Sequence, residues 1–378
     1  MSIQFLDVGK KAVTYLTCTQ ADLSSELIRD WLPSFAVSSP IAYLGWPMQL
    51  LEEKPLDKNQ CLCIHPKVAT ADRQWKGFVS WMLGVAGARV ALKQMGYRWI
   101  APASAFYQER TTDVDVEWPD KFPKCRLSLA RAVGNKSKLR PDYLALKRKK
   151  KGQYPITSVE AKGTMQAIMS EKFISCPSKW AQQVRNIELS FDGKPLPISR
   201  YLVFGTRVCP KRNPAIINPL AIRAWNSASS GPKYDHSPEK ILPIVYANLF
   251  GLFQNLGQFN VAEGLAESLE RNFGIPGTQL WLKFDDKSTP SSNPPRPISV
   301  EKVCKEKFGN GLVIEVSISD ELAELTESLI EAETTSKAVK SFLDSEDSLD
   351  KWENTGRRVG VPAGTARLSC GVEVAFRS

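Results

Sequence analysis

Residues 140–146 read RPDYLAL and residues 156–162 read ITSVEAK. The apolar and β-branched residues in both stretches predict two strands, and Pro141 stands at the entrance of the first, where its missing N–H matters least. A short basic turn from Lys147 to Gly152 joins the two stretches. The pattern therefore predicts a β-hairpin whose strands carry charged residues, Asp142 on the first and Glu160 and Lys162 on the second.

Outward from the hairpin, the periodicity predicts further elements on both sides. Apolar residues at helical spacing predict a helix from Trp75 to Gly96, followed by a strand from Tyr97 to Tyr107. After the hairpin, a helix is predicted from Ser178 to Leu189 and a strand from Ile198 to Val208. The order helix, three strands, helix, strand is typical of an α/β layer structure with a central sheet.

Three glycines lie within the helix predicted from Trp75 to Gly96. Gly77, Gly84 and Gly87 lower its intrinsic helix propensity. Glycine in a helix is useful where the backbone must approach another element closely. We therefore expect this helix to pack closely against the sheet through its glycines.

The flanking regions differ from the α/β core. Residues before the core contain short mixed segments broken by prolines, whereas those after about residue 224 are largely helical. A helix is expected to start at Ser237-Pro238-Glu239 with the serine hydroxyl as cap, and an acidic helix to start at Asp320. We predict four regions: a small α+β N-terminal region at 1–72, the α/β core at 73–223, a helical region at 224–287, and a C-terminal region with the acidic helix at 300–378.

Charge is distributed unevenly along the chain. The net charge is +10, but residues 121–223 hold 22 Lys or Arg against 5 Asp or Glu, a net of +17. Residues 320–353 hold 3 basic against 11 acidic residues, a net of −8. A basic segment of this size indicates a polyanionic partner, because cationic side chains displace the counterions of phosphates. A basic surface that serves only solubility is the alternative.

Composition excludes several classes of protein. No long apolar run predicts a membrane span, the first residues do not resemble a secretory signal, and the eight cysteines are scattered, so we expect a reduced, cytoplasmic protein. Two histidines exclude chemistry built on several histidines. Alternation of Cys61, Cys63 and His65 loosely suggests zinc, although no fourth ligand is evident and small buried side chains on a strand are the simpler interpretation.

Chemistry is expected where the two hairpin strands lie side by side. Glu160 and Lys162 are two residues apart, so strand alternation places both on one face. If the strands pair, Asp142 joins them. Two adjacent carboxylates repel each other unless a cation lies between them, and hard oxygen ligands suit Mg²⁺ or Mn²⁺. Such a metal polarises a phosphate and lowers the pKa of a bound water.

Pro141-Asp142 followed by Glu160-Ala161-Lys162 resembles the signature of the PD-(D/E)xK nuclease superfamily, the restriction-endonuclease-like proteins. The family core of helix, three strands, helix and strand is similar to the order predicted from about Trp75 to Cys209. The resemblance implies a Mg²⁺-dependent phosphodiesterase acting on nucleic acid. It implies Asp142, Glu160 and the Ala161 carbonyl as metal ligands, with Asp142, Glu160 and Lys162 as the catalytic residues.

One feature departs from the family pattern. Many members supply another acidic residue from the first helix, and Trp75 to Gly96 contains no Asp or Glu. Glu109, Asp113 or Asp115, in the loop after the following strand, are the candidates to replace it.

Other residues are candidates for binding nucleic acid near the site. The basic turn, Lys147, Arg148, Lys149, Lys150 and Lys151, contacts phosphates in this hypothesis and is a solvated hairpin tip in the alternative. The second helix of the family often presents a Gln or Lys to the site, which points here to Lys179, Gln182 and Gln183. Stacking of Trp180 and Trp225 on bases is weighed against core packing, which is the more frequent role.

Two functions follow from these observations. The first is a metal-dependent endonuclease, most simply on DNA, for which family analogy adds a restriction or antiviral defence role. The second is a nucleic-acid-binding or assembly module with an inactive nuclease fold. A homodimer, or a partner subunit held by the C-terminal region, fits either. The acidic helix is a solvated face in the simplest interpretation and a shield over the basic region in a bolder one.

Overall fold

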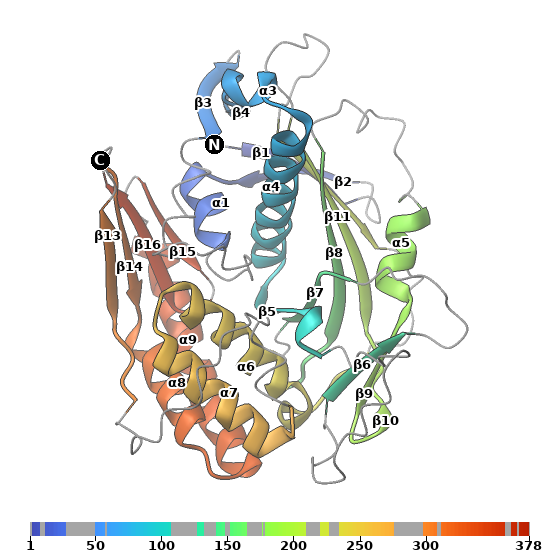
Figure 1. Ribbon diagram of the computed structural model, residues 1–378, viewed down its shortest axis with the longest axis vertical. Helices are drawn as coiled ribbons and strands as arrows, with labels where there is room; N and C mark the ends of the chain where they lie inside the picture. The colour runs from blue at the N-terminus through green and yellow to red at the C-terminus, as the bar shows by residue number, and fades with distance from the viewer. Residues whose placement is uncertain are drawn as a thin grey trace.

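The computed structural model is a mixed α/β protein built around a seven-stranded mixed sheet (Figure 1). Among the residues described, no helix is both long and apolar enough to cross a membrane. The described residues are 2–7, 12–27, 50–56, 59–106, 127–131, 141–147, 152–164, 176, 178–208, 220–226, 234–275, 298–307, 311–359, 364–368 and 370–377.

The six elements predicted for the core are all present, in the predicted order. Neighbouring strands of the sheet follow the order β11-β8-β7-β5; β8 and β11 are parallel, whereas the other two pairs are antiparallel. The elements are α4 (Arg73–Gln94), β5 (Tyr97–Pro102), β7 (Tyr143–Lys147), β8 (Ile156–Thr164), α5 (Ser178–Arg185) and β11 (Arg200–Val208).

The N-terminal residues extend this sheet. β1 (Ser2–Asp7) pairs in parallel with β12 (Leu220–Asn226), and β2 (Ala12–Thr17) forms the outer edge. β3 (Leu51–Leu56) and β4 (Asn59–Ile64) form a separate hairpin ahead of the short helix α3 (Pro66–Thr70). The full sheet order is therefore β2-β1-β12-β11-β8-β7-β5, so strands from three parts of the sequence surround the predicted hairpin.

Two predicted boundaries are wrong. The helix predicted to Leu189 ends at Arg185, and β9 (Ile187–Phe191) follows, because buried and exposed residues alternate there and the segment pairs with β6 (Leu127–Arg131). β6 itself, joined through β9 to the two-residue β10 (Lys194–Pro195), was not predicted within its polar, proline-containing stretch. The strand predicted to Tyr107 ends at Pro102 and continues as a 3₁₀ turn, Ala103–Phe106.

Helix α4 packs against the sheet through glycine, as predicted for two of its three glycines. A Cβ on Gly84 would lie 2.5 Å from the Gly163 nitrogen in β8, and a Cβ on Gly87 would lie 2.5 Å from the Thr206 hydroxyl in β11. Gly77 has open space around it, so the prediction is wrong there. Any side chain at Gly84 or Gly87 would therefore push α4 off the sheet.

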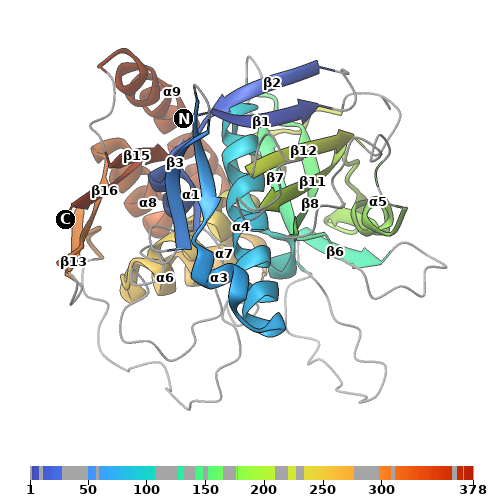
Figure 2. The ribbon, with the colours of Figure 1, turned by 90° about the horizontal axis from the view of Figure 1, so that it is seen from above.

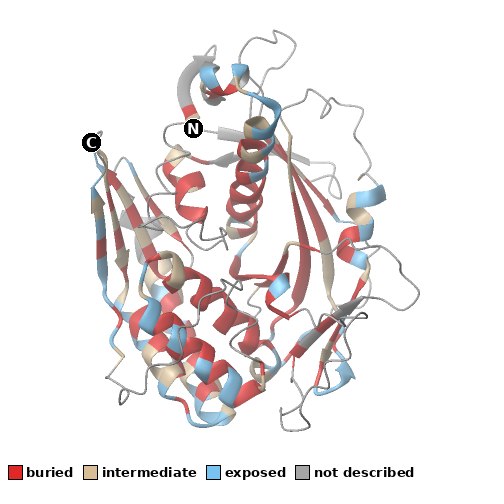
Figure 3. Ribbon diagram, viewed as in Figure 1, coloured by how far each residue is buried: buried red, intermediate tan, exposed pale blue. Residues whose placement is uncertain are grey.

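The C-terminal half is helical with a small antiparallel sheet of order β13-β14-β16-β15 (Figure 1). The expected helix start at Ser237 is confirmed, although its hydroxyl makes no capping hydrogen bond. Figure 3 shows helix α6 buried along most of its length. The elements are α6 (Pro238–Asn255), α7 (Phe259–Phe273), β13 (Val303–Lys307), β14 (Val313–Ile318), α8 (Asp320–Glu331), α9 (Thr335–Val359), β15 (Thr365–Leu368) and β16 (Val372–Arg377).

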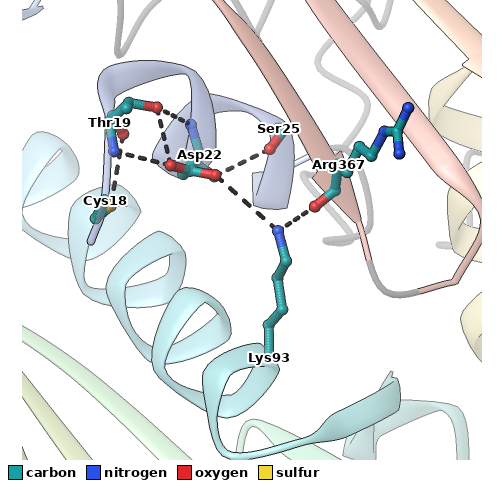
Figure 4. Close-up of polar contacts among 6 residues, drawn as sticks. All are labelled: Cys18, Thr19, Asp22, Ser25, Lys93 and Arg367. Atoms are coloured by element: carbon teal, nitrogen blue, oxygen red, sulfur yellow. Dashed lines mark hydrogen bonds and ion pairs between the residues drawn. The ribbon is translucent and has the colours of Figure 1, made fainter. Parts of the chain in front are cut away.

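Helix α1 (Gln20–Glu26) joins the N-terminal region to α4 and the C-terminal sheet (Figure 4). It starts with a capping box, in which the Asp22 N–H donates to the Thr19 hydroxyl and the Thr19 N–H donates to the Asp22 carboxylate. Lys93 of α4 donates to the Arg367 carbonyl of β15 and lies 4.0 Å from the same carboxylate. One lysine thus connects three regions that are far apart in the sequence.

Candidate active site

The hairpin strands β7 and β8 pair as the sequence predicts, with Tyr143 opposite Val159. Asp142 immediately precedes β7, and its N–H donates to the Val159 carbonyl at 2.9 Å. Its carboxylate in turn accepts a hydrogen bond from the Ala161 N–H at 2.7 Å. Asp142 is therefore fixed against β8 between Val159 and Ala161.

Alternation along the two strands sets which face each side chain occupies. Gly163 lies against α4, and the Arg89 guanidinium of α4 lies over the Tyr143 ring at 4.7 Å from its centroid. Asp142 is one residue from Tyr143, and Lys162 and Glu160 are one and three residues from Gly163, so alternation places all three on the opposite face. Figures 1 and 2 show α4 and α5 on opposite sides of the sheet, so this is the face toward α5.

Glu160 and Lys162 form an ion pair on this face. The Glu160 side chain is 0% exposed, whereas the Lys162 side chain is 32% exposed. The lysine therefore reaches solvent while it holds a carboxylate that does not. The structure brings Asp142, Glu160 and Lys162 together at one place, at the entrance of β7 and toward the carboxyl end of β8.

The Glu160 carboxyl is in an unfavourable environment for a charge. Burial, and then the negative charge of Asp142, raise its pKa to about 8, and the positive charge of Lys162 opposes this only in part. Neither oxygen of Glu160 accepts a hydrogen bond of good geometry. A buried carboxyl is costly where its ion pair only partly offsets burial and a neighbouring negative charge, so this site is incomplete as a purely structural feature.

A divalent cation fits this donor set. It would offset the repulsion between the two carboxylates, which Lys162 offsets only in part, and carboxylates are hard ligands that Mg²⁺ prefers. Within the described part of the chain, no three His, Cys, Asp or Glu side chains gather to hold a metal. Two protein carboxylates are nevertheless enough for Mg²⁺, which commonly keeps several waters. The role of the Ala161 carbonyl stays a prediction.

A third acidic ligand was expected from Glu109, Asp113 or Asp115. All three lie in 107–126, outside the described residues. Helix α4 contributes no acidic residue, and the Asp72 carboxylate just before it accepts a hydrogen bond from the Trp75 N–H as the helix cap. Asp72 is thus engaged in starting the helix.

The structure separates Lys147 from the end of the hairpin at which Asp142 lies. Lys147 ends β7, so it lies about 16 Å along the strand from Asp142. Its ammonium donates to the Met95 carbonyl at 2.6 Å and lies 5.9 Å from the centroid of the Tyr97 ring. Arg148, Lys149, Lys150 and Lys151 are not among the residues described. Lys147 therefore has a structural contact and is not brought to the site.

The candidates on helix α5 differ in burial. Gln183 is buried, whereas Lys179 and Gln182 are exposed. Trp225 of β12 is 2% exposed and packs edge-on against Trp180 of α5, with ring centroids 6.0 Å apart. Core packing, the more frequent role, is confirmed for Trp225. Of these three candidates on α5, Gln183 alone is buried.

The zinc alternative receives no support from His65. Its Nδ1 accepts a hydrogen bond from the Lys67 N–H at 3.2 Å, which caps helix α3. The side chains of Cys61 and Cys63 lie outside what the structure describes, although their segment forms the predicted strand β4. The described role of His65 is therefore helix capping.

The acidic helix predicted from Asp320 is wrong as a single element, because the segment forms two helices, α8 and α9, and the second contacts the far end of the sheet. Asp350 and Glu353 of α9 pair with Arg98 of β5, and the Tyr154 hydroxyl donates to Glu346. Arg98 is next to Tyr97, which pairs with Lys147, so these contacts gather at the hairpin end and not at the Asp142 end. These three acidic side chains therefore hold α9 to the sheet at the end away from Asp142.

Two arginines that were not predicted as site residues lie on the candidate face. Arg223 of β12 is in register with Gly205, which is in register with Lys162, and Arg207 of β11 is in register with Thr164. Strand alternation in the sequence does indicate that Arg207 and Val203 share one face of their strand, but it does not show which strand lies beside them. The sequence held no signal for the order of β12, β11 and β8, so it did not connect either arginine with Lys162.

Comparison with known proteins adds no relative. No protein-family model, no curated protein and no solved structure matches this chain. The function of this chain must therefore be inferred from the geometry of Asp142, Glu160 and Lys162 and from the charge around them.

Proposed function

We propose that this chain is a divalent-metal-dependent nuclease that hydrolyses phosphodiester bonds, with DNA as its substrate and Mg²⁺ or Mn²⁺ as its metal. The observation that carries the proposal is the buried Glu160 carboxyl, which lies beside a second negative charge and is only partly compensated by its ion pair with Lys162. Perturbed carboxyl pKa values of this kind cluster at functional sites.

The metal, when bound between Asp142 and Glu160, would supply Lewis-acid stabilisation of the phosphate and a more acidic water. Asp142 is already oriented for this, because the Ala161 N–H holds its carboxylate against β8. Lys162 is half-exposed beside Glu160, where its ammonium can orient the attacking water and stabilise charge that develops on the phosphate. Burial of Glu160 excludes bulk water from one side of the reaction.

The order of elements supports the same proposal. The core contains a helix, three strands, a helix and a further strand in this order, with β6, β9 and β10 as additional strands. Asp142 immediately precedes β7, and Glu160 and Lys162 lie in β8. This agrees with the expectation from the PD-(D/E)xK resemblance. A restriction or antiviral defence role rests on that resemblance alone; phage plating on cells with and without the active chain would test it.

The direct test is cleavage of plasmid and linear DNA in Mg²⁺, in Mn²⁺ and in EDTA. We expect cutting that requires metal and disappears in Glu160→Ala and in Lys162→Ala. Glu333→Gln and Lys337→Ala are matched controls, since both residues are exposed, with Glu333 between α8 and α9 and Lys337 in α9. Cutting that survives in both active-site variants would refute the proposed roles.

The second candidate is a nucleic-acid-binding module. The observation in its favour is the absence of any Asp or Glu in α4 together with the net charge of +17 in residues 121–223. No cutting under any condition, with tight and salt-sensitive binding retained, would favour this module over the nuclease.

A further inference from the structure

Rows of side chains cross β8, β11 and β12 on the face opposite α4. Residues in register on neighbouring strands share a face, and Gly163 and Thr206 define the α4 face through their closeness to that helix. Three rows therefore occupy the other face: Glu160–Val203–Trp225, Lys162–Gly205–Arg223 and Thr164–Arg207–Ala221.

Helix α5 covers the first row. Val184 of α5 packs in one cluster with Val203 and Trp225, and Trp180 joins them from the same helix. The next two rows lie about 7 and 13 Å further toward the carboxyl end of β8, at 3.3 Å per residue. The sheet face thus changes from Glu160 and two apolar side chains under α5 to basic side chains beyond it.

The two basic rows carry three cations and no acidic residue. Lys162, Arg223 and Arg207 are all half-buried. Lys162 and Arg223 are two strands apart, about 10 Å at ordinary strand spacing, and Gly205 adds no side chain between them. Half-burial keeps the stems of these side chains fixed on the sheet while part of each remains accessible.

We propose that Arg207 and Arg223, together with Lys162, form a phosphate-binding row that holds one strand of nucleic acid across β8, β11 and β12. The proposal deepens the proposed nuclease function, since Lys162 belongs to both. Charge complementarity argues for this occupant, because the planar guanidinium fork matches phosphate oxygens in two-point contacts. The row begins at the catalytic lysine, so phosphates next to the scissile one would lie on the arginines.

The test is equilibrium binding of a fluorescent single-stranded oligonucleotide in EDTA over a range of KCl concentrations. The chain carries Glu160→Gln so that no cleavage interferes. We expect Arg207→Gln and Arg223→Gln each to weaken binding roughly tenfold. Each should also lower the slope of log affinity against log salt by about 0.7, the value for one lost phosphate contact on a single strand.

Matched variants separate charge from folding. Arg377→Gln removes an exposed arginine of the C-terminal sheet and should change neither affinity nor slope. Arg207→Lys and Arg223→Lys keep the charge and should keep most of the slope. An unchanged slope in both folded glutamine variants would overturn the proposal.

A second measurement uses the unmodified chain and so does not depend on any variant folding. Phenylglyoxal modifies accessible arginines, and mass spectrometry reports each modified peptide. We expect the oligonucleotide to protect Arg207 and Arg223 but not Arg377. Equal reactivity with and without oligonucleotide, or equal protection by polyglutamate of the same charge, would overturn the assignment.

Failure of the two proposals gives different results. If the chain never cuts DNA but the glutamine variants lower the salt slope, the row stands and the nuclease proposal fails. If the chain cuts DNA while both variants keep an unchanged slope and KM, the nuclease stands and the row fails.

Discussion

The two ends of the β7–β8 hairpin differ in how well their buried ionisable groups are compensated by neighbouring charges. At one end, the buried Glu160 pairs with Lys162 but lies next to the negative charge of Asp142, so its charge is only partly compensated. At the other, the buried Arg98 is paired with two carboxylates of α9, and Tyr154 donates to the buried Glu346. Charge that is paired holds elements together, whereas buried charge that is incompletely satisfied destabilises the fold and indicates function.

The comparison also contradicts the expectation that Lys147, at the start of the basic turn, lies near the candidate site. Lys147, the described member of the basic run at 147–151, lies at the structural end, where α9 contacts Gly152 through Leu343 and Tyr154 through Glu346. The proposed catalytic end is less conspicuous in the sequence, because it has single charged residues in apolar strands.

Glu160→Gln should have the largest effect on activity and should distinguish the two ends of the hairpin most clearly. We expect a loss of metal-dependent cleavage of at least ~10²–10³-fold, since the ligand charge disappears while the shape remains. Turnover of supercoiled plasmid under saturating metal measures it. At the structural end, Arg98→Met should leave activity per folded molecule unchanged, and an equal loss there would remove the distinction between the ends.

The raised pKa of Glu160 predicts a pH dependence of stability. The folded chain holds the Glu160 proton up to about pH 8, whereas the unfolded chain loses it near 4.5, so stabilisation present below 4.5 is lost as pH rises through 8. In EDTA, the melting temperature should fall over this window in the original chain. The fall should be smaller in Glu160→Gln, and saturating Mg²⁺ should reduce it. Identical pH profiles for the two chains would contradict the account.

Arg98→Met should destabilise the chain by about 2 kcal/mol, because it leaves two partly exposed carboxylates of α9 without their cation. Urea unfolding measures the change. Lys337→Met, which breaks an exposed pair with Glu333, is the matched control and should change stability by about 0.5 kcal/mol or less. Equal effects would mean that burial of Arg98 does not matter.

Gly163→Ala tests the close contact between β8 and helix α4. Its Cβ would lie 1.6 Å from the Ser80 carbonyl oxygen, so α4 or β8 must move, at a cost of about 1–3 kcal/mol. Because Gly163 follows Lys162, cleavage should fall as well. Gly77→Ala, in open space on the same helix, should instead stabilise by up to about 1 kcal/mol. Unchanged stability and cleavage in Gly163→Ala would contradict this contact.

Lys147→Met should have the smallest effect. It removes one hydrogen bond to the Met95 carbonyl, worth about 1 kcal/mol, at the end remote from Asp142. Cleavage and the salt slope of binding should stay within about twofold of the original chain, because no phosphate contact is lost. A decrease of about 0.7 in the slope of log affinity against log salt would instead indicate that the basic turn contacts phosphate.

The sequence by itself determined the hairpin and the shared face of its charged residues. Apolar alternation predicted β7 and β8, and the two-residue spacing of Glu160 and Lys162 placed them together. Glycines in α4 predicted close packing, which holds at Gly84 and Gly87. These features depend on a few adjacent residues, because strand and helix periodicities are local properties of the chain.

Only the tertiary structure decided the rest. The end of α5 at Arg185 depends on β6 as a strand partner for 187–191, and the basic rows depend on β12 lying beside β11. Burial of Glu160, which raises its pKa, likewise needs the surrounding elements in place. The physical reason is common to all three: desolvation and strand pairing arise between segments distant in sequence, so no local pattern encodes which segments meet.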